Sequence, residues 1–259
     1  MKRFLAIGIV TATLLAGCAG LDEDETKNWS AERFYSAAKE KMDDGDYDSA
    51  IKYLEKLEAR FPYGRHAEQA QLEAAYAYYK NDDAALAIAA AERFIRLHPT
   101  HPNVDYAYYL RGLVNFHGEQ NFINWLFGAK DDLAERDPKG TREAYLAFKE
   151  VVERFPHSRY AEDSAKRMAY LFEAQARHEV LVARFYYNRG AYVAAVNRCK
   201  FALENFPQTP SMEDALGIQA MAYKRMGLDP LYTDTLRILR LNFPDSRYLA
   251  EAETLRAGG

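Results

Sequence analysis

Residues 153–162 read Glu-Arg-Phe-Pro-His-Ser-Arg-Tyr-Ala-Glu, and the chain contains five versions of this stretch. The others lie at 60–67, 97–102, 205–209 and 242–248, and in each an aromatic residue or a histidine precedes a proline. Proline cannot continue a helix and restricts the residue before it, so each copy predicts a helix end. A Ser, Thr or Asp soon after the proline suits the start of the next helix. A stop and restart at a regular interval is typical of a helical repeat protein.

The spacing of the five prolines supports this interpretation. Pro62, Pro99, Pro156, Pro207 and Pro244 are separated by 37, 57, 51 and 37 residues. Turn-type or small residues recur at fixed distances before them: Gly45, Asp82, Lys139, Gly190 and Gly227, then Ala50, Ala87, Ala144, Ala195 and Tyr232. The pattern resembles the tetratricopeptide repeat (TPR), in which small residues let two antiparallel helices approach and a turn residue tolerates left-handed backbone. We therefore expect an all-α TPR superhelix of five helix pairs plus a terminal helix.

The expected boundaries follow from these signals. The solenoid covers 30–257, with repeats at 30–62, 66–99, 103–156, 159–207 and 211–244 and a terminal helix at 248–256. Two intervals exceed 37 residues, and each excess predicts a local departure from the repeat. The third repeat carries an insertion at 118–136, and the fourth begins with an overlong helix at about 159–189.

The first 17 residues have the pattern of a secretory signal peptide. Lys2 and Arg3 precede an apolar run of 13 residues at 4–16, which is too short to cross a bilayer. Leu-Ala-Gly-Cys at 15–18 resembles a bacterial lipobox. That resemblance implies a diacylglyceryl group on the Cys18 thiol and an acyl group on its freed amine. The alternative is an ordinary signal peptide with a chance cysteine.

An acidic tether at 18–29 would then separate the lipidated residue from the folded part. In enterobacteria an Asp after the acylated cysteine tends to retain lipoproteins at the inner membrane. Ala19 stands there instead, which fits anchoring in the periplasmic leaflet of the outer membrane. With Cys18 consumed by lipid, Cys199 has no disulfide partner, and its helical spacing from Val196 and Leu203 predicts a buried side chain.

Composition and motifs exclude several functions. The chain has 259 residues, of which 49% are hydrophobic and 14% aromatic, and its net charge of −4 argues against polybasic nucleic-acid binding. His98 and His101 flank Pro99 and cannot share a helix face, and no other residues complete a tetrahedral metal site. His178-Glu179 lacks the second histidine of a zinc-protease helix. We therefore expect no metal, no cofactor and no enzymatic activity.

Three further blocks carry a more specific resemblance. They are residues 91–109, residues 136–138 and residues 178–198. Together with the lipobox they resemble the BamD family of lipoproteins, which belongs to the outer-membrane β-barrel assembly machinery. The resemblance implies five TPRs, no catalysis, and docking to the barrel subunit BamA and the lipoproteins BamC and BamE. It also implies that the N-terminal half meets unfolded outer-membrane proteins and that the C-terminal half holds the barrel subunit's periplasmic domain.

Two other functions use a similar architecture. A TPR pilot lipoprotein for pilus or secretin assembly also carries a lipobox, but such proteins lack blocks like 93–99 and 192–198. A superhelical peptidoglycan enzyme would need a catalytic domain after the solenoid, and we expect none.

Aromatic residues on first helices suggest a client-binding groove. Tyr76, Tyr79, Tyr109 and Phe116 fall at positions that usually line the groove of this repeat class. Aromatic side chains there can hold an extended or helical peptide. The alternative for each residue is a place in the core.

The second helix of the fourth repeat predicts a partner interface. At 100° per residue, Tyr192, Ala195, Val196, Cys199, Leu203 and Phe206 form a buried stripe. The opposite face is a ridge of Ala194, Arg198, Phe201 and Asn205, and Arg and aromatic residues dominate binding hot spots. We expect this ridge to bind the barrel subunit. The alternative is that the fifth repeat covers Phe201 and leaves Arg198 as an ordinary surface charge.

Overall fold

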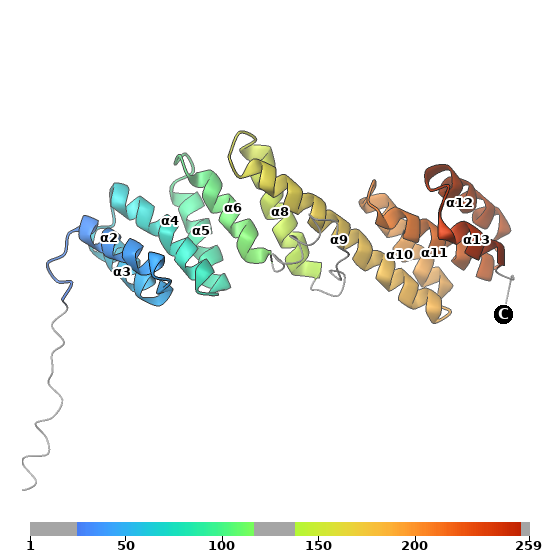
Figure 1. Cartoon of the computed structure of the whole chain (residues 1–259), viewed down its shortest axis with the longest axis horizontal. Helices are drawn as coiled ribbons and strands as arrows, with labels where there is room; N and C mark the ends of the chain where they lie inside the picture. The colour runs from blue at the N-terminus through green and yellow to red at the C-terminus, as the bar shows by residue number, and fades with distance from the viewer. Residues whose placement is uncertain (1–24, 117–137, 255–259) are drawn as a thin grey trace, which may run out of the picture.

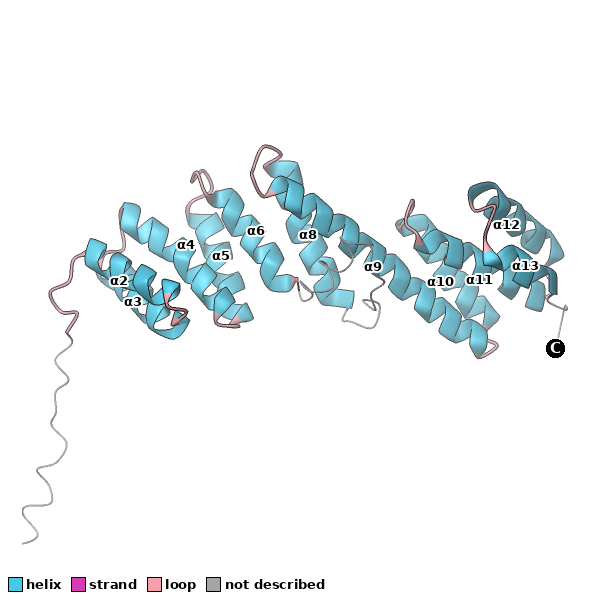
Figure 2. Cartoon of the chain, viewed as in Figure 1, coloured by secondary structure: helices cyan, strands magenta, loops and turns pink. Residues whose placement is uncertain are grey.

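In the computed structural model, residues 25–116 and 138–254 are described, and they form a row of antiparallel helix pairs (Figures 1 and 2). All the regular elements in these ranges are helices, which confirms the predicted fold class. The helices are α2 (Ala31–Asp43), α3 (Tyr47–Arg60), α4 (Arg65–Lys80), α5 (Ala84–Leu97), α6 (Val104–Asn115), α8 (Pro138–Arg154), α9 (Ala161–Asn188), α10 (Tyr192–Asn205), α11 (Ser211–Arg225), α12 (Asp229–Asn242) and α13 (Arg247–Thr254). Within the described ranges, no helix is both long and apolar enough to span a bilayer.

The helix ends lie where the sequence pattern places them. Turns within the pairs use left-handed backbone at Gly45, Asp82, Gly190 and Gly227, with φ between 64° and 78°. Glycine adopts this conformation without strain, which explains its place in three of these four turns. Lys139 is the exception to the alignment, since it lies in the first turn of α8 rather than in a turn between helices. The predicted insertion at 118–136 lies outside the described residues.

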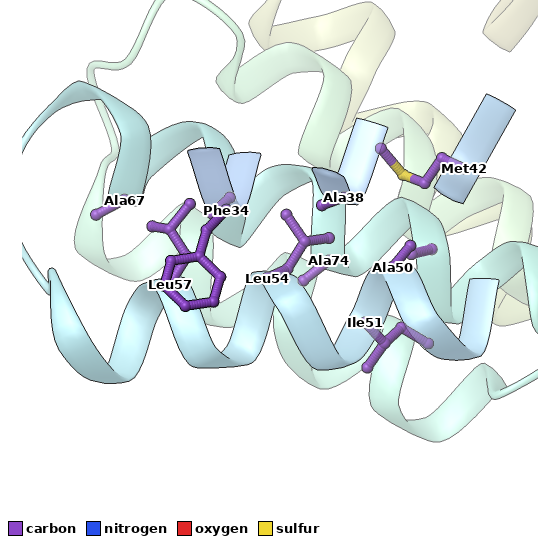
Figure 3. Packing of buried hydrophobic residues seen from close by; sticks show 11 residues of the cluster. Phe34, Ala38, Met42, Ala50, Ile51, Leu54, Leu57, Ala67 and Ala74 are labelled. Atoms are coloured by element: carbon purple, nitrogen blue, oxygen red, sulfur yellow. The ribbon is translucent and has the colours of Figure 1, made fainter. Parts of the chain in front are cut away.

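Small residues at the helix crossings set the packing distance. Where α2, α3 and α4 cross, Ala38, Ala50 and Ala67 are at most 2% exposed and lie among Phe34 and larger aliphatic side chains (Figure 3). Small residues bring the helix axes together, and large ones fill the remaining space at high density. Cys199 is fully buried in the corresponding core of the fourth and fifth repeats, as predicted.

The terminal helix α13 is held against α11 by one interlocking contact. Tyr248 is 1% exposed, and its ring lies over Gly217 of α11. Its hydroxyl donates to Asp214 Oδ1 at 2.5 Å and accepts from Arg184 Nη2 at 2.6 Å. Asp214 also accepts a hydrogen bond from Arg247 at 2.9 Å. One carboxylate therefore joins α9, α11 and α13.

Candidate binding grooves

One groove lies across the first helices of the N-terminal repeats. We call it the first-helix groove. It has a volume of about 470 Å³ and is lined by Lys39, Met42 and Asp43 of α2, Leu72, Glu73 and Tyr76 of α4, Asn103, Tyr106, and Arg159 and Tyr160 before α9. Four successive repeats thus contribute to one surface, so an extended ligand can contact all of them.

Tyrosines form the apolar part of this groove. The Tyr106 ring lies 5.4 Å from the Tyr160 ring, and Tyr160 stacks on Tyr109 at 4.7 Å. Tyr76 meets Tyr47 edge to face at 6.4 Å. Burial raises the pKa of both Tyr76 and Tyr106, so their phenols stay protonated at neutral pH. The groove therefore offers neutral aromatic faces with hydroxyl groups.

Charged side chains of α2 and α4 add a polar part. Glu73 accepts a hydrogen bond from Tyr35 at 3.3 Å and pairs with Lys39 at 3.4 Å. Burial, followed by the charge of Glu73, raises the pKa of Tyr35 to about 12. A ligand here meets an acid and a base that already neutralise each other, so aromatic contact and hydrogen bonding contribute more than net charge.

Of the four residues predicted to line this groove, the structure places one in its lining and three elsewhere. Tyr76 lines it. Tyr109 lies behind it, where its ring supports Tyr160 and its hydroxyl donates to Asp163 at 2.7 Å. Tyr79 is half-buried and packs on the core between α4, α5 and α6. For Phe116 the surface assignment is wrong, because its side chain is 6% exposed and packs on Phe148 and Tyr170.

A second groove lies where α8 and α10 meet the middle of α9. We call it the α8–α10 groove. Its volume is about 530 Å³, and its lining is Thr141, Arg142, Tyr145 and Leu146 of α8, Phe172, Ala174, Gln175, His178 and Glu179 of α9, and Phe201, Asn205 and Phe206. Tyr145 stacks on Phe172 at 5.9 Å, and Phe172 meets Phe206 edge to face at 5.2 Å. The result is an aromatic floor with a polar rim.

The predicted ridge of α10 borders this second groove. Phe201 is 45% exposed, so the fifth repeat does not cover it, and Asn205 lines the groove beside it. Arg198 donates from Nη1 to Glu179 Oε2 at 3.0 Å, and Glu179 is itself a lining residue. Ala194, one turn earlier, is half-buried. Phe201 and Asn205 of the ridge therefore line the α8–α10 groove, Arg198 is joined to it through Glu179, and Ala194 is not among the lining residues.

The ion pair between Arg198 and Glu179 fixes an exposed guanidinium group at the rim of the groove. The Glu179 side chain is 14% exposed, whereas that of Arg198 is 46% exposed. A guanidinium held by one carboxylate keeps further N–H donors for a second acceptor. The geometry thus suits a partner that brings an acidic or carbonyl group to Arg198 and an apolar side chain to Phe201.

A third cavity, of about 540 Å³, lies between α3, α4 and α5. Its polar groups are largely paired with one another: Tyr78 donates to Glu55, Gln71 donates to Glu58, and Arg93 forms an ion pair with Glu58. Paired groups leave fewer sites for a ligand, so this cavity is the weakest candidate. No group of three or more His, Cys, Asp or Glu side chains that could hold a metal is found in residues 25–116 and 138–254.

Reasoning from the sequence missed several lining residues. Tyr106 and Tyr160 belong to the first-helix groove, and Tyr145 and Phe172 to the α8–α10 groove. Each site combines separate helices, whereas a helical-wheel argument treats one helix at a time. The aromatic residue four positions after Pro156 was the available signal for Tyr160.

The fold and its grooves define a helical-repeat scaffold of the TPR type, with binding surfaces suited to polypeptide segments. Residues 27–239 match the family described as "YfiO: Outer membrane lipoprotein", and the chain belongs to this family. It is 47% identical over 256 residues to a Neisseria gonorrhoeae protein named outer membrane protein assembly factor BamD, covering 97% of this chain and 95% of that one. The protein of the same name from Vibrio cholerae is 38% identical over 242 residues, covering 93% of this chain and 99% of that one.

Proposed function

We propose that this protein is a lipid-anchored scaffold of the outer-membrane protein assembly machinery. It binds the periplasmic domain of a BamA-like barrel subunit, BamC- and BamE-like lipoproteins, and unfolded outer-membrane proteins. The observation that carries the proposal is the α8–α10 groove, where exposed Phe201 stands beside Arg198 on a scaffold whose relatives are named outer membrane protein assembly factors. These names support the assembly role and give no support to a pilus or secretin pilot.

The proposed partner surface combines an apolar anchor with a charge. Phe201 and Leu146 are 45% and 48% exposed, on opposite walls of the α8–α10 groove. Both side chains line one groove, and contiguous apolar surface marks interaction sites more often than single scattered residues do. A partner side chain inserted between them would be desolvated while Arg198 pairs at the rim, which is the arrangement of a hot spot.

The proposed client surface is the first-helix groove. Tyr76, Tyr106 and Tyr160 present rings across three repeats. Such a surface fits an extended segment rich in aromatic side chains, because ring–ring contacts add to the burial of area. No reaction is needed for either role, and we propose a non-catalytic protein without metal or cofactor.

The anchor completes the proposed function. Acylation of Cys18 by two or three chains would hold the protein stably on the periplasmic leaflet of the outer membrane. The protein then presents both grooves in the periplasm without contacting nucleic acid. Depletion distinguishes this function from that of a pilot lipoprotein, since loss of a general assembly factor lowers many barrel proteins and loss of a pilot removes one appendage.

The partner surface is tested by copurification of the barrel subunit with the lipidated protein. Phe201→Ala and Arg198→Ala should each cost about 2 kcal/mol or more of binding, as hot-spot truncations do, without lowering the melting temperature. Leu241→Ala and Arg237→Ala are matched controls, because both side chains are exposed on α12, at 74% and 69%. Normal binding by both ridge variants would remove the ridge from the interface.

The client surface is tested by crosslinking to a barrel-protein C-terminal peptide. Tyr76→Ala and Tyr106→Ala should reduce crosslinking while helical content stays unchanged. Tyr232→Ala on α12 is the control, since it removes a half-buried tyrosine far along the row of helices. Equal crosslinking by all three variants would count against the groove.

A further inference from the structure

The segment that leads to the anchor is fixed to one end of the first repeat. Thr26 is 5% exposed, its carbonyl accepts a hydrogen bond from Arg60, and its hydroxyl accepts one from Lys56 at 3.4 Å. Trp29 packs on Phe34 and Tyr53 at 5.2 and 5.4 Å. Arg60 ends α3, so the chain departs toward Cys18 beside the loop between α3 and α4.

That loop differs from its four counterparts. Residues 61–64 read Phe-Pro-Tyr-Gly, and Tyr63 is 91% exposed. The residue after the proline is polar in the other copies: Thr100, His157, Gln208 and Asp245. The repeat pattern therefore does not require an aromatic residue at this position. Among the five copies of the stretch, only the one at 60–67, beside the anchor, has a tyrosine after the proline.

Basic side chains surround the same loop. Lys52, Lys56 and Arg60 are exposed and spaced four residues apart on α3, so they form a stripe that leads to it, and Arg65 is exposed on its other side. The three acids of α3 all have partners elsewhere: Asp48 accepts a hydrogen bond from Asn81, Glu55 accepts one from Tyr78, and Glu58 pairs with Arg93. An exposed tyrosine flanked by cations is the combination found at membrane–water interfaces, where the ring lies among headgroups and Arg or Lys meets phosphates.

The tether length brings this surface to the membrane. Thr26 lies eight residues after Cys18 in the sequence, which limits the distance between them to about 29 Å. This upper limit is comparable to the width of two or three helices. A short tether gives weak contacts a high effective concentration, so modest affinity suffices.

We propose that residues 61–64 with the flanking basic side chains form a membrane-facing surface that rests on phospholipid headgroups beside the anchor. The inference relies on acylation of Cys18, which is part of the proposed function. It adds an orientation: the end of the first repeat formed by the start of α2 and the loop between α3 and α4 lies on the bilayer.

The test uses the full-length lipidated protein in vesicles of phosphatidylethanolamine and phosphatidylglycerol at 3:1. Tyr63→Cys carries an environment-sensitive fluorophore, and lipids with a quencher near the headgroup report contact. His157→Cys and Asp245→Cys occupy the equivalent position of other copies and serve as controls. Cys199 does not compete for the label, because burial raises the pKa of its thiol to about 12.

We expect several-fold stronger quenching at position 63 than at 157 or 245. Equal quenching at all three positions would overturn the proposal. Density-gradient flotation separates this outcome from anchor failure: protein that does not float lacks the anchor, whereas protein that floats with a water-exposed label has the anchor without the contact.

Charge reversal tests the role of the basic side chains. Lys52→Glu with Arg65→Glu should lower quenching at position 63, and more on vesicles containing phosphatidylglycerol than on phosphatidylcholine alone. The acidic run at 22–25 is the competing occupant of this surface. If quenching develops only after Asp22, Glu23 and Asp24 are changed to Ser, the tether covers the surface and the proposal is wrong.

Discussion

Gly217→Ala should detach the terminal helix from the fifth repeat. A Cβ atom at Gly217 would lie 2.1 Å from Cγ and 2.4 Å from Cδ2 of Tyr248. Carbon atoms attract one another at about 3.5–4.0 Å, so the ring must move by more than 1 Å. Such a shift breaks the hydrogen bonds of the Tyr248 hydroxyl with Asp214 and Arg184.

The expected cost is the difference between two effects. Overpacking of a well-filled core costs about 1–3 kcal/mol. Alanine has a higher helix propensity than glycine, and this stabilises the folded state by up to about 1 kcal/mol. The upper limit is the free energy of unfolding lost when a buried aromatic side chain is removed altogether, about 3–5 kcal/mol. We therefore expect a net destabilisation of about 2 kcal/mol, or roughly 4–8 °C in melting temperature for a chain of this size.

Hydrogen exchange gives the most direct measurement. Repeat arrays lose stability locally, so amides of α11 and α13 should exchange faster while those of α2 to α5 keep their rates. The control is the same change in a Tyr248→Ala background. There the clash is absent, and Gly217→Ala should be neutral or slightly stabilising. An equal cost in both backgrounds would refute the interlocking contact, because the two positions would then be energetically independent.

Three further outcomes are expected. Cys18→Ser should yield unprocessed or soluble protein, and an unacylated wild-type N-terminus in mass spectrometry would contradict the anchor. Leu54→Ala should destabilise the first repeat by about 2–5 kcal/mol in denaturant titrations, because Leu54 is fully buried, whereas the exposed control Leu241→Ala should change little. Burial raises the pKa of Glu173 above its usual value near 4.5, because the buried site favours the protonated carboxyl group. The protonated group therefore contributes to stability below pH 4.5, and this contribution is lost as the pH rises through the raised pKa. Glu173→Gln should accordingly raise the melting temperature at pH 7.5 and leave it nearly unchanged at pH 4, and a drop at pH 7.5 would show that the carboxylate is stabilising.

The fold was predictable because its signals are local and repeated. A proline ends each second helix, and a left-handed turn residue such as Gly45 or Gly227 separates the two helices of a pair. These features act on the backbone within a few residues and need no knowledge of the tertiary structure. The repeat starts expected at 30 and 66 therefore lie within one residue of Ala31 and Arg65, the first residues of α2 and α4.

The grooves were less predictable because they depend on contacts between helices. Phe116 has the spacing of a groove residue, but its ring fills the space between α6, α8 and α9. Gly112, one turn earlier, shows why: a Cβ there would lie 2.6 Å from the Phe148 ring, so α6 and α8 approach closely at this point. Helical periodicity predicts the direction in which a side chain points. Whether it then meets solvent or the core depends on the position of the neighbouring helix.

The long helix α9 explains how one departure from the repeat produces a binding site. Its 28 residues are twice the length of α10, and a helix of that length extends about 42 Å. Both α8 and α10 pack antiparallel to it, so the start of α8 at Thr141–Leu146 and the end of α10 at Phe201–Phe206 come together at its middle (Figure 1). Between these two helix ends, Phe172, Gln175, His178 and Glu179 of α9 line the groove. The 51-residue interval in the sequence thus encodes extra turns of α9, and those turns bring the half-buried Phe172 into the groove where we propose that the barrel subunit binds.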